Sequence, residues 1–178
     1  MFAVVLTGPP GAGKSTVATA VHDRLGDAGV PNALIEVDEL ERCYPPLDEA
    51  RVFANLGAVC AGYRDAGHSL LFVTATIEDD AYGARLLTAL GAAGHLLVRL
   101  EAEPGTLRRR IRDREPAGWS GLDDLLASAD RLAARMPGLS GAGLVLGTEN
   151  AAPDELAARV EAAIAATGHL PPEITARC

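Results

Sequence analysis

The chain has 178 residues, 48% of them hydrophobic, which is enough to build one domain around a packed core and argues against disorder. Its formal net charge of −8, without a basic tail, argues against a nucleic-acid-binding protein. No apolar run approaches the roughly 20 residues of a membrane helix, the first residues lack signal-peptide features, and Cys43, Cys60 and Cys178 show no metal-ligand spacing. We therefore expect a single cytoplasmic domain over residues 1–178, with reduced thiols and with neither a membrane nor a nucleic acid as partner.

The chain opens with a predicted strand, a glycine-rich turn and a predicted helix. Residues 2–7 form a short apolar run typical of a buried strand, and residues 15–28 have helical spacing. Between them, GPPGAGKS fits the P-loop pattern G-x-x-x-x-G-K-[ST] at every required position. Such a loop turns its backbone N–H groups toward phosphate oxygens at the positive end of a helix dipole. The predicted nucleotide-binding residues are Gly8, Pro9, Pro10, Gly11, Ala12, Gly13, Lys14, Ser15 and Thr16.

Lys14 is the only lysine in a chain that has fifteen arginines. A lysine ammonium is a compact point charge, whereas an arginine guanidinium is a wide planar fork, and a narrow phosphate site admits the former. If compositional bias had left one lysine at random, that lysine would not need to lie inside the motif. We predict that Lys14 contacts the β- and γ-phosphates and that the Ser15 hydroxyl binds Mg²⁺.

Residues 33–37 predict a second strand, and Asp38 follows at its carboxyl end. Ligands of open α/β sheets bind beyond the carboxyl ends of the strands. Asp38 is therefore predicted to be a general base or a hydroxyl-orienting group, and the alternative is a helix N-cap. In a strand, Glu36 and Asp38 would share a face. Arg42 and Arg51 flank the start of the next predicted helix and could bind an anionic substrate, although solvated surface charge is an equal alternative.

Residues 69–75 predict a third strand that ends without the Asp of a Walker B motif, since positions 73–76 read VTAT. The next acids, at positions 78–80, fit the first turn of the following helix, where the helix dipole favours them. A second holder of Mg²⁺ therefore stays open: Asp38, Glu36 or Thr76 could act through water.

A fourth predicted strand over residues 95–101 is followed by a strongly cationic helix over residues 107–114. Arg110 and Arg114 are four residues apart and so lie on one face of that helix. We predict a lid over approximately residues 108–121 that brings both guanidinium groups to the phosphates, and the alternative is a solvated helix face. A last helix begins at Pro153, after a loop over residues 147–150 where an adenine ring would rest.

The P-loop after the first strand, Asp38 after the second and the arginines after the fourth resemble the small P-loop kinases over nearly the whole chain. The likeness is greatest to the kinases of small hydroxylated molecules: adenylylsulfate (APS) kinase, gluconate kinase, shikimate kinase and chloramphenicol phosphotransferase. It implies a three-layer α/β/α P-loop NTPase fold, with a five-stranded parallel sheet of order 2-3-1-4-5 and a small helical lid. The bare end of the third strand is similar to that of APS kinase, and the acids at 36 and 38 only approximate the pair of shikimate kinase.

The expected function is transfer of the γ-phosphoryl group of ATP to a hydroxyl of a small molecule, with ATP and Mg²⁺ as cofactors. Lys14, Asp38, Arg110 and Arg114 are the expected catalytic residues; Arg110 also contacts the nucleotide, and Asp38, Arg42 and Arg51 contact the substrate. The alternatives are a regulatory ATPase and a kinase-like protein without turnover. A GTPase is excluded because its guanine motif needs a second lysine. The acceptor and the oligomeric state stay open.

Overall fold

The computed structural model of the protein describes residues 1–170; residues 171–178, among them Cys178, lie outside the described part. Within residues 1–170, five parallel strands form one sheet of order β2-β3-β1-β4-β5, which confirms the expected topology. Cys43 and Cys60 are both free thiols. The strands are β1 (Phe2–Thr7), β2 (Asn32–Glu36), β3 (Leu70–Thr74), β4 (Gly94–Glu101) and β5 (Leu144–Gly147).

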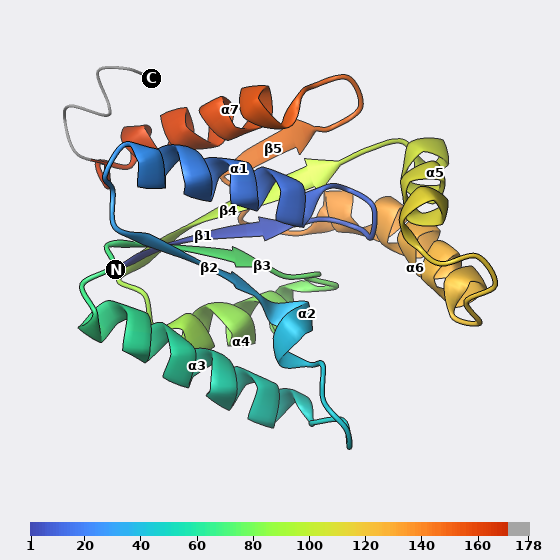
Figure 1. The fold of residues 1–178 in the computed structure, drawn as a ribbon, viewed down its shortest axis with the longest axis horizontal. Coiled ribbons are helices and arrows are strands. Elements are labelled where there is room, and N and C mark those ends of the chain that lie inside the picture. The colour runs from blue at the N-terminus through green and yellow to red at the C-terminus, as the bar shows by residue number, and fades with distance from the viewer. Residues whose placement is uncertain (171–178) are drawn as a thin grey trace.

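Helices cover both faces of the sheet, as the expected three-layer arrangement requires (Figure 1). Helices α1 (Lys14–Asp27) and α7 (Pro153–Ala166) lie on one face, and α3 (Glu49–Asp65) and α4 (Asp80–Leu90) lie on the other. The remaining helices are α2 (Val37–Leu40), α5 (Pro104–Arg114), α6 (Leu122–Arg135) and the short 3-10 helix η1 (Met136–Gly138). Within residues 1–170, none of these helices combines the length and the hydropathy needed to cross a bilayer.

Strand β1 supplies side chains to both hydrophobic cores. Phe2, Val4 and Leu6 pack in the core under α1 and α7, whereas Ala3 and Val5 pack in the core under α3 and α4. Successive side chains of a strand point to opposite faces, so a central parallel strand must be apolar at every position. This explains why residues 2–6 carry no polar side chain, and it places the P-loop at the end of a fully buried strand.

The second strand begins and ends one residue earlier than expected, and this changes the environment of Asp38. Strand β2 ends at Glu36, and the chain turns directly into α2, which contains Asp38 and Glu39 in its first turn. Acidic side chains there are favoured by the helix dipole, which explains why the chain leaves the sheet early. The expectation that Glu36 and Asp38 share a strand face is therefore wrong.

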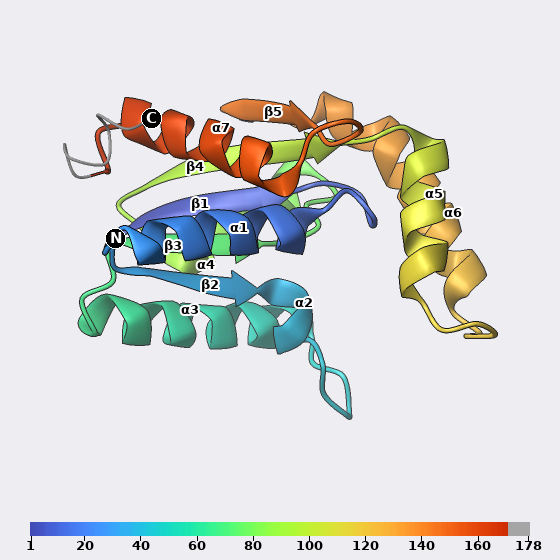
Figure 2. The same cartoon turned by 45° about the horizontal axis from the view of Figure 1, so that its top comes forward.

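Helices α5 and α6 form a hairpin beyond the carboxyl ends of the strands (Figure 2). Ile111, Leu126 and Ala129 form a small core of their own between the two helices. The cationic helix begins at Pro104, three residues earlier than expected, because proline suits the first turn of a helix. The predicted lid segment 108–121 thus comprises most of α5 and the connection to α6.

A charged pair joins the two helices on the P-loop face of the sheet. Arg24 of α1 donates to both carboxylate oxygens of Glu161 on α7, at 2.5 and 3.0 Å. The Glu161 side chain is 8% exposed, whereas that of Arg24 is 43% exposed. The carboxylate therefore depends on this pair much more than the guanidinium does, because water still reaches the guanidinium.

We predict an asymmetric loss of stability when this pair is broken. Arg24→Ala leaves a buried carboxylate without its ion pair and should cost about 2 kcal/mol in the free energy of unfolding, discounted for partial exposure. Glu161→Ala leaves a hydrated guanidinium and should cost about 1 kcal/mol. Urea denaturation measures both, with Arg159→Ala as an exposed control on α7. Equal losses for the two variants would contradict the argument.

Candidate active site

The P-loop, Asp38 and the predicted lid arginines line one cavity of about 460 Å³. Gly13 has a φ of 92° and is the N-cap of α1, so the loop enters the helix through a left-handed turn that suits glycine. The N–H groups of the first helical turn have no partner within the helix, which makes this end of α1 suited to a phosphate. The lining residues are Pro10, Gly11, Gly13, Lys14, Ser15, Thr16, Asp38, Thr74, Thr76, Arg110, Arg114 and Leu125. The other loop residues, Gly8, Pro9 and Ala12, are buried.

Lys14 is folded back onto the loop that precedes it. Its Nζ donates a hydrogen bond to the Gly8 carbonyl oxygen at 3.0 Å. Burial lowers the pKa of the Lys14 ammonium, Asp38 opposes this shift, Arg114 adds to it, and Glu36 opposes it. A cation in such surroundings lacks a full counter-charge, and a phosphate would supply one.

Ser15, which lines this cavity, contacts Glu36 at the end of β2. The Ser15 hydroxyl donates to the Glu36 carboxylate at 2.9 Å. The sequence placed Glu36 only among three residues that could hold Mg²⁺ through water, and its position as the last residue of β2 now explains why it lies next to Ser15. Thr74 and Thr76, which stand where a Walker B acid would be, also line the cavity.

Arg110 connects three separate segments of the chain. Its guanidinium donates to the Gly11 carbonyl oxygen at 3.3 Å, to the Thr148 hydroxyl at 2.9 Å and to the Thr148 carbonyl oxygen at 2.6 Å. It thereby joins α5 to the P-loop and to the loop after β5, where the adenine ring was expected. Arg114 pairs with its neighbour Glu115 at 2.6 Å and is exposed. Both arginines line the cavity as predicted from their spacing, but the partnership with Thr148 had no signal in the sequence.

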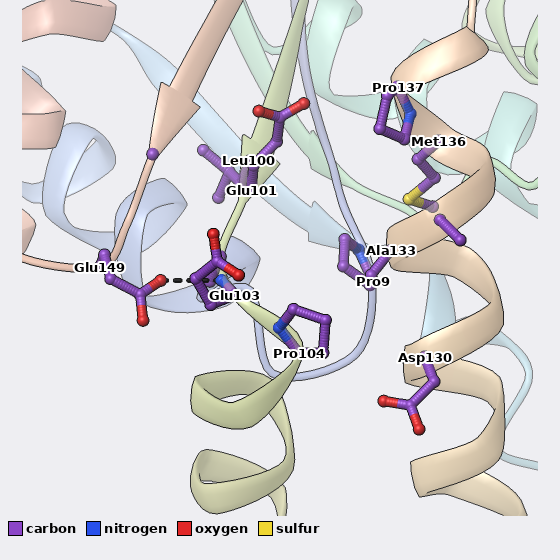
Figure 3. Close-up of a pocket in the computed structure, with 13 residues that line it drawn as sticks. Pro9, Leu100, Glu101, Glu103, Pro104, Asp130, Ala133, Met136, Pro137 and Glu149 are labelled. Carbon is purple, nitrogen blue, oxygen red and sulfur yellow. Dashed lines mark hydrogen bonds between the residues drawn. The ribbon is translucent and has the colours of Figure 1, made fainter.

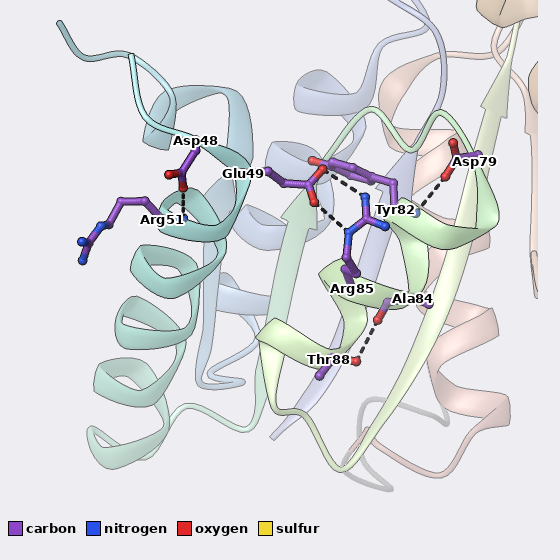
Figure 4. A network of polar contacts seen from close by, with 8 residues as sticks. All are labelled: Asp48, Glu49, Arg51, Asp79, Tyr82, Ala84, Arg85 and Thr88. Atoms are coloured by element: carbon purple, nitrogen blue, oxygen red, sulfur yellow. Dashed lines mark hydrogen bonds and ion pairs between the residues drawn. The ribbon is translucent and has the colours of Figure 1, made fainter. Parts of the chain in front are cut away.

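Arg42 and Arg51, the other two predicted substrate residues, lie elsewhere. Arg42 pairs with Glu39 at 3.2 Å, and its side chain is 78% exposed. The Arg51 side chain points away from the adjoining Glu49–Arg85 pair (Figure 4). Neither residue lines the cavity at the P-loop or the acidic cavity beside it. Their role in substrate binding stays a prediction.

An acidic cavity of about 410 Å³ adjoins the P-loop cavity and shares Asp38 and Thr76 with it. Figure 4 shows four of its lining residues, Glu49, Asp79, Tyr82 and Arg85. No local sequence pattern indicates this cavity, because its walls come from α2, α3 and the start of α4. Burial, Asp38 and Glu49 raise the pKa of Glu41. Burial and the acids around it raise the pKa of Tyr82 to about 12. The further lining residues are Glu41, Glu49, Glu78, Asp79, Tyr82 and Arg85.

A third cavity, of about 530 Å³, lies between the end of β4 and helix α6 (Figure 3). It is lined largely by apolar groups such as Met136 and Ala133, and of the P-loop it contacts Pro9. The Glu103 N–H donates to the Glu149 carboxylate at 2.8 Å on its far side. Although this cavity is larger, Lys14 and Ser15 do not line it, so we place the candidate chemistry in the two cavities that meet at Asp38.

The comparisons with known proteins agree with this geometry. A family model described as an AAA domain matches residues 4–139. No curated protein matches the sequence. The APS kinase of Mycobacterium tuberculosis, in complex with AMPPNP and APS, is similar with a TM-score of 0.69 and 21% identity, over 92% of this chain and 96% of that chain. An unliganded sugar kinase from Janibacter sp. has a TM-score of 0.65 and 20% identity, over 98% of both chains. Shikimate kinase from Acinetobacter baumannii, in complex with shikimate, has a TM-score of 0.54 and 21% identity, over 93% of both chains. The expected resemblance to small P-loop kinases is confirmed for the fold.

We predict that the pKa of Lys14, the single lysine, responds directly to the charges of this site. In nucleotide-free protein labelled with ε-¹³C lysine, one resonance should titrate below the ordinary value of 10.5, because burial disfavours the ammonium. Asp38→Asn should lower this pKa further, and Arg114→Gln should raise it, since the two charges act in opposite directions. Glu39→Gln, one position from Asp38, is the matched control and should leave it unchanged. An upward shift in Asp38→Asn would show that Asp38 does not stabilise the ammonium.

Proposed function

The chain belongs to the AAA domain family, and from this membership we propose that it transfers the γ-phosphoryl group of ATP to a hydroxyl group of a small molecule. Nucleotide-dependent phosphotransfer in general is supported by the P-loop kinase fold. One observation carries the finer proposal: the P-loop cavity opens beside a second cavity, and Asp38 lies on the wall of both. A donor and an acceptor held in adjoining cavities react as if at a high effective concentration.

In this proposal the phosphates of ATP bind to the P-loop, and Lys14 exchanges its bond to the Gly8 carbonyl for the β- and γ-phosphate oxygens. Ser15 and Glu36 are hard oxygen donors 2.9 Å apart, which is the chemistry that Mg²⁺ prefers. Ser15 would hold the ion directly and Glu36 through water. When bound, Mg²⁺ neutralises charge on the phosphates.

Asp38 receives the acceptor at the junction of the two cavities. Its carboxylate accepts a hydrogen bond from the acceptor hydroxyl and takes the proton as the oxygen–phosphorus bond forms. Lys14 and Arg114 stabilise the negative charge of the transferring group. Arg110 keeps α5 in contact with the P-loop through Gly11 and Thr148.

We include a lid in the proposal. The hairpin of α5 and α6 stands over the carboxyl ends of the strands, and Leu125 of α6 lines the P-loop cavity together with both lid arginines. Closure of the segment around residues 108–121 would exclude water from the phosphates. Exclusion of water favours transfer to the acceptor over hydrolysis.

The first prediction from this proposal separates nucleotide binding from transfer. Lys14→Ala should weaken ATP binding by at least about tenfold, because a charged hydrogen bond is lost. Asp38→Asn should keep ATP binding within about twofold but lower the transfer rate about 100-fold or more, the range for loss of a general base. Calorimetry measures ATP binding, and mass spectrometry of an acceptor mixture with ATP measures transfer. Arg159→Gln, at an exposed position of α7, is the control.

Two outcomes would contradict the proposal. Normal ATP binding by Lys14→Ala would show that the P-loop does not bind the phosphates of ATP. ATP hydrolysis without an acceptor, at the same rate in Asp38→Asn, would favour a regulatory ATPase.

The second prediction concerns the ion. Glu36→Gln should raise the Mg²⁺ concentration needed for half-maximal binding of ATP several-fold, because a neutral amide holds the ion's water less strongly than a carboxylate does. Binding of ATP without Mg²⁺ should be unchanged. Glu39→Gln is the control, since its carboxylate pairs with Arg42 outside the cavity. An unchanged Mg²⁺ dependence in Glu36→Gln would exclude this residue as a holder of the ion.

A further inference from the structure

The structure points to the chemical class of the acceptor. We propose that the acidic cavity beside the P-loop binds a small polyhydroxylated molecule that carries a protonated amine. This inference rests on the proposed function, because that function makes the cavity the acceptor site. The cavity has about 410 Å³ and adjoins the nucleotide cavity at Asp38 and Thr76, so it is placed to present a hydroxyl to the γ-phosphate.

The charge of the cavity wall is strongly negative. Its lining includes five carboxylates, Asp38, Glu41, Glu49, Glu78 and Asp79. Among the described residues, the carboxylates of Asp38, Glu41 and Glu78 form no hydrogen bond or ion pair, and Asp38 interacts electrostatically with Lys14 on one side and with Glu41 on the other. Asp79 accepts from the Tyr82 N–H at 2.8 Å and pairs with Arg135 at 3.6 Å. At least three carboxylates are thus free to meet a cation.

The cationic groups near the cavity are not available to an anionic acceptor. Arg85 is the one cation in the described lining, and it forms two bonds to Glu49, at 2.7 and 3.1 Å. Arg42 is paired with Glu39, and Arg51 points away from the cavity (Figure 4). A carboxylate or sulfate group entering here would meet like charge without a compensating donor, which opposes binding.

The occupant is an organic cation rather than a bare metal ion. Within residues 1–170, no group of three His, Cys, Asp or Glu side chains could hold a metal ion. The volume suits a molecule of several carbon atoms, and the ring of Tyr82, packed against Phe53 at 5.4 Å between centroids, forms part of the wall. An aromatic face beside carboxylates is a favourable surface for an ammonium group.

In the proposed phosphoryl transfer, the amine of the acceptor contributes to recognition and does not react. A protonated amine has no lone pair, so it cannot attack phosphorus. The hydroxyl of the same molecule attacks instead: its oxygen forms the new bond to the γ-phosphorus, the bond from that phosphorus to ADP breaks, and the hydroxyl proton goes to Asp38. The carboxylates of Glu41 and Glu78 hold the ammonium and take no part in the transfer.

A matched series of three six-carbon polyols tests the inference. Glucamine, sorbitol and gluconate differ at C1, where they carry an amine, a hydroxyl and a carboxylate; the alkylamine is protonated at neutral pH, as a lysine side chain is. Each is titrated into the full chain with AMPPNP and Mg²⁺ bound, by calorimetry and by ligand-observed NMR, which detects millimolar affinities. We expect glucamine to bind about tenfold more tightly than sorbitol, and gluconate to bind least.

Variants of the lining residues test whether the preference for glucamine arises in the acidic cavity. The double variant Glu41→Gln/Glu78→Gln should reduce the preference for glucamine to about twofold or less, and Glu78→Lys should move it toward gluconate. Both positions are exposed, so folding should be preserved. Asp65→Asn, at an exposed position at the end of α3 outside the cavity, should keep the full preference. The preference should also weaken as salt is added.

Three results would overturn the inference: equal or tighter binding of sorbitol or gluconate, a preference that survives in the double variant, and no binding of glucamine at all. Binding of AMPPNP is measured first in the same sample, so a failure of the nucleotide site is seen separately. If glucamine is preferred but ATP phosphorylates none of its hydroxyls, the charge inference stands and the phosphotransfer proposal fails.

Discussion

The site depends on the direct backbone contact between the P-loop and helix α5. A Cβ atom at Gly11 would lie 2.8 Å from the Leu107 carbonyl oxygen, so a side chain at position 11 would force the loop and the helix apart. The same approach lets Arg110 reach the Gly11 carbonyl oxygen and Thr148. One glycine therefore links the end of β1, the base of the lid hairpin and the loop after β5. If this contact opened, the lid arginines would lose their position relative to Lys14.

The early end of strand β2 separates two acidic functions that the sequence would combine. Glu36 remains at the end of the strand and meets Ser15 on the nucleotide side. Asp38, two residues later, lies in α2 and borders both cavities. In a longer strand, both carboxylates would point to the same face and compete for one position. The short helix thus places one acid beside Ser15 and the other between the two cavities, as the roles proposed for them with Mg²⁺ and with the acceptor require.

The parts that were predictable from the sequence are those defined by local pattern. The P-loop is a continuous motif after an apolar strand, and the alternation of strands and helices predicts a parallel sheet, whose strand order followed from the resemblance to small P-loop kinases. The spacing of Arg110 and Arg114 was enough to place both on one cavity. The contact of Arg110 with Thr148 joins residues 38 positions apart, and no local pattern encodes it. The acidic cavity was hidden for the same reason. Its carboxylates come from three segments of the chain. The sequence explained Asp79 only by its place at the start of a helix, and Asp79 does cap that helix.

The charges of the two cavities support one another electrostatically. Lys14 and Arg114 form the positive side, which ATP would occupy, and the ATP phosphates would add negative charge opposite Asp38. An anionic acceptor would then lie between these phosphates and the carboxylates of the second cavity. A cationic acceptor at the same place is attracted from both sides, and the attraction grows as the lid excludes water. Part of the negative charge behind the net charge of −8 is therefore concentrated at the candidate site. In the proposed complex, the P-loop accepts an anion, and a cation is favoured beside it.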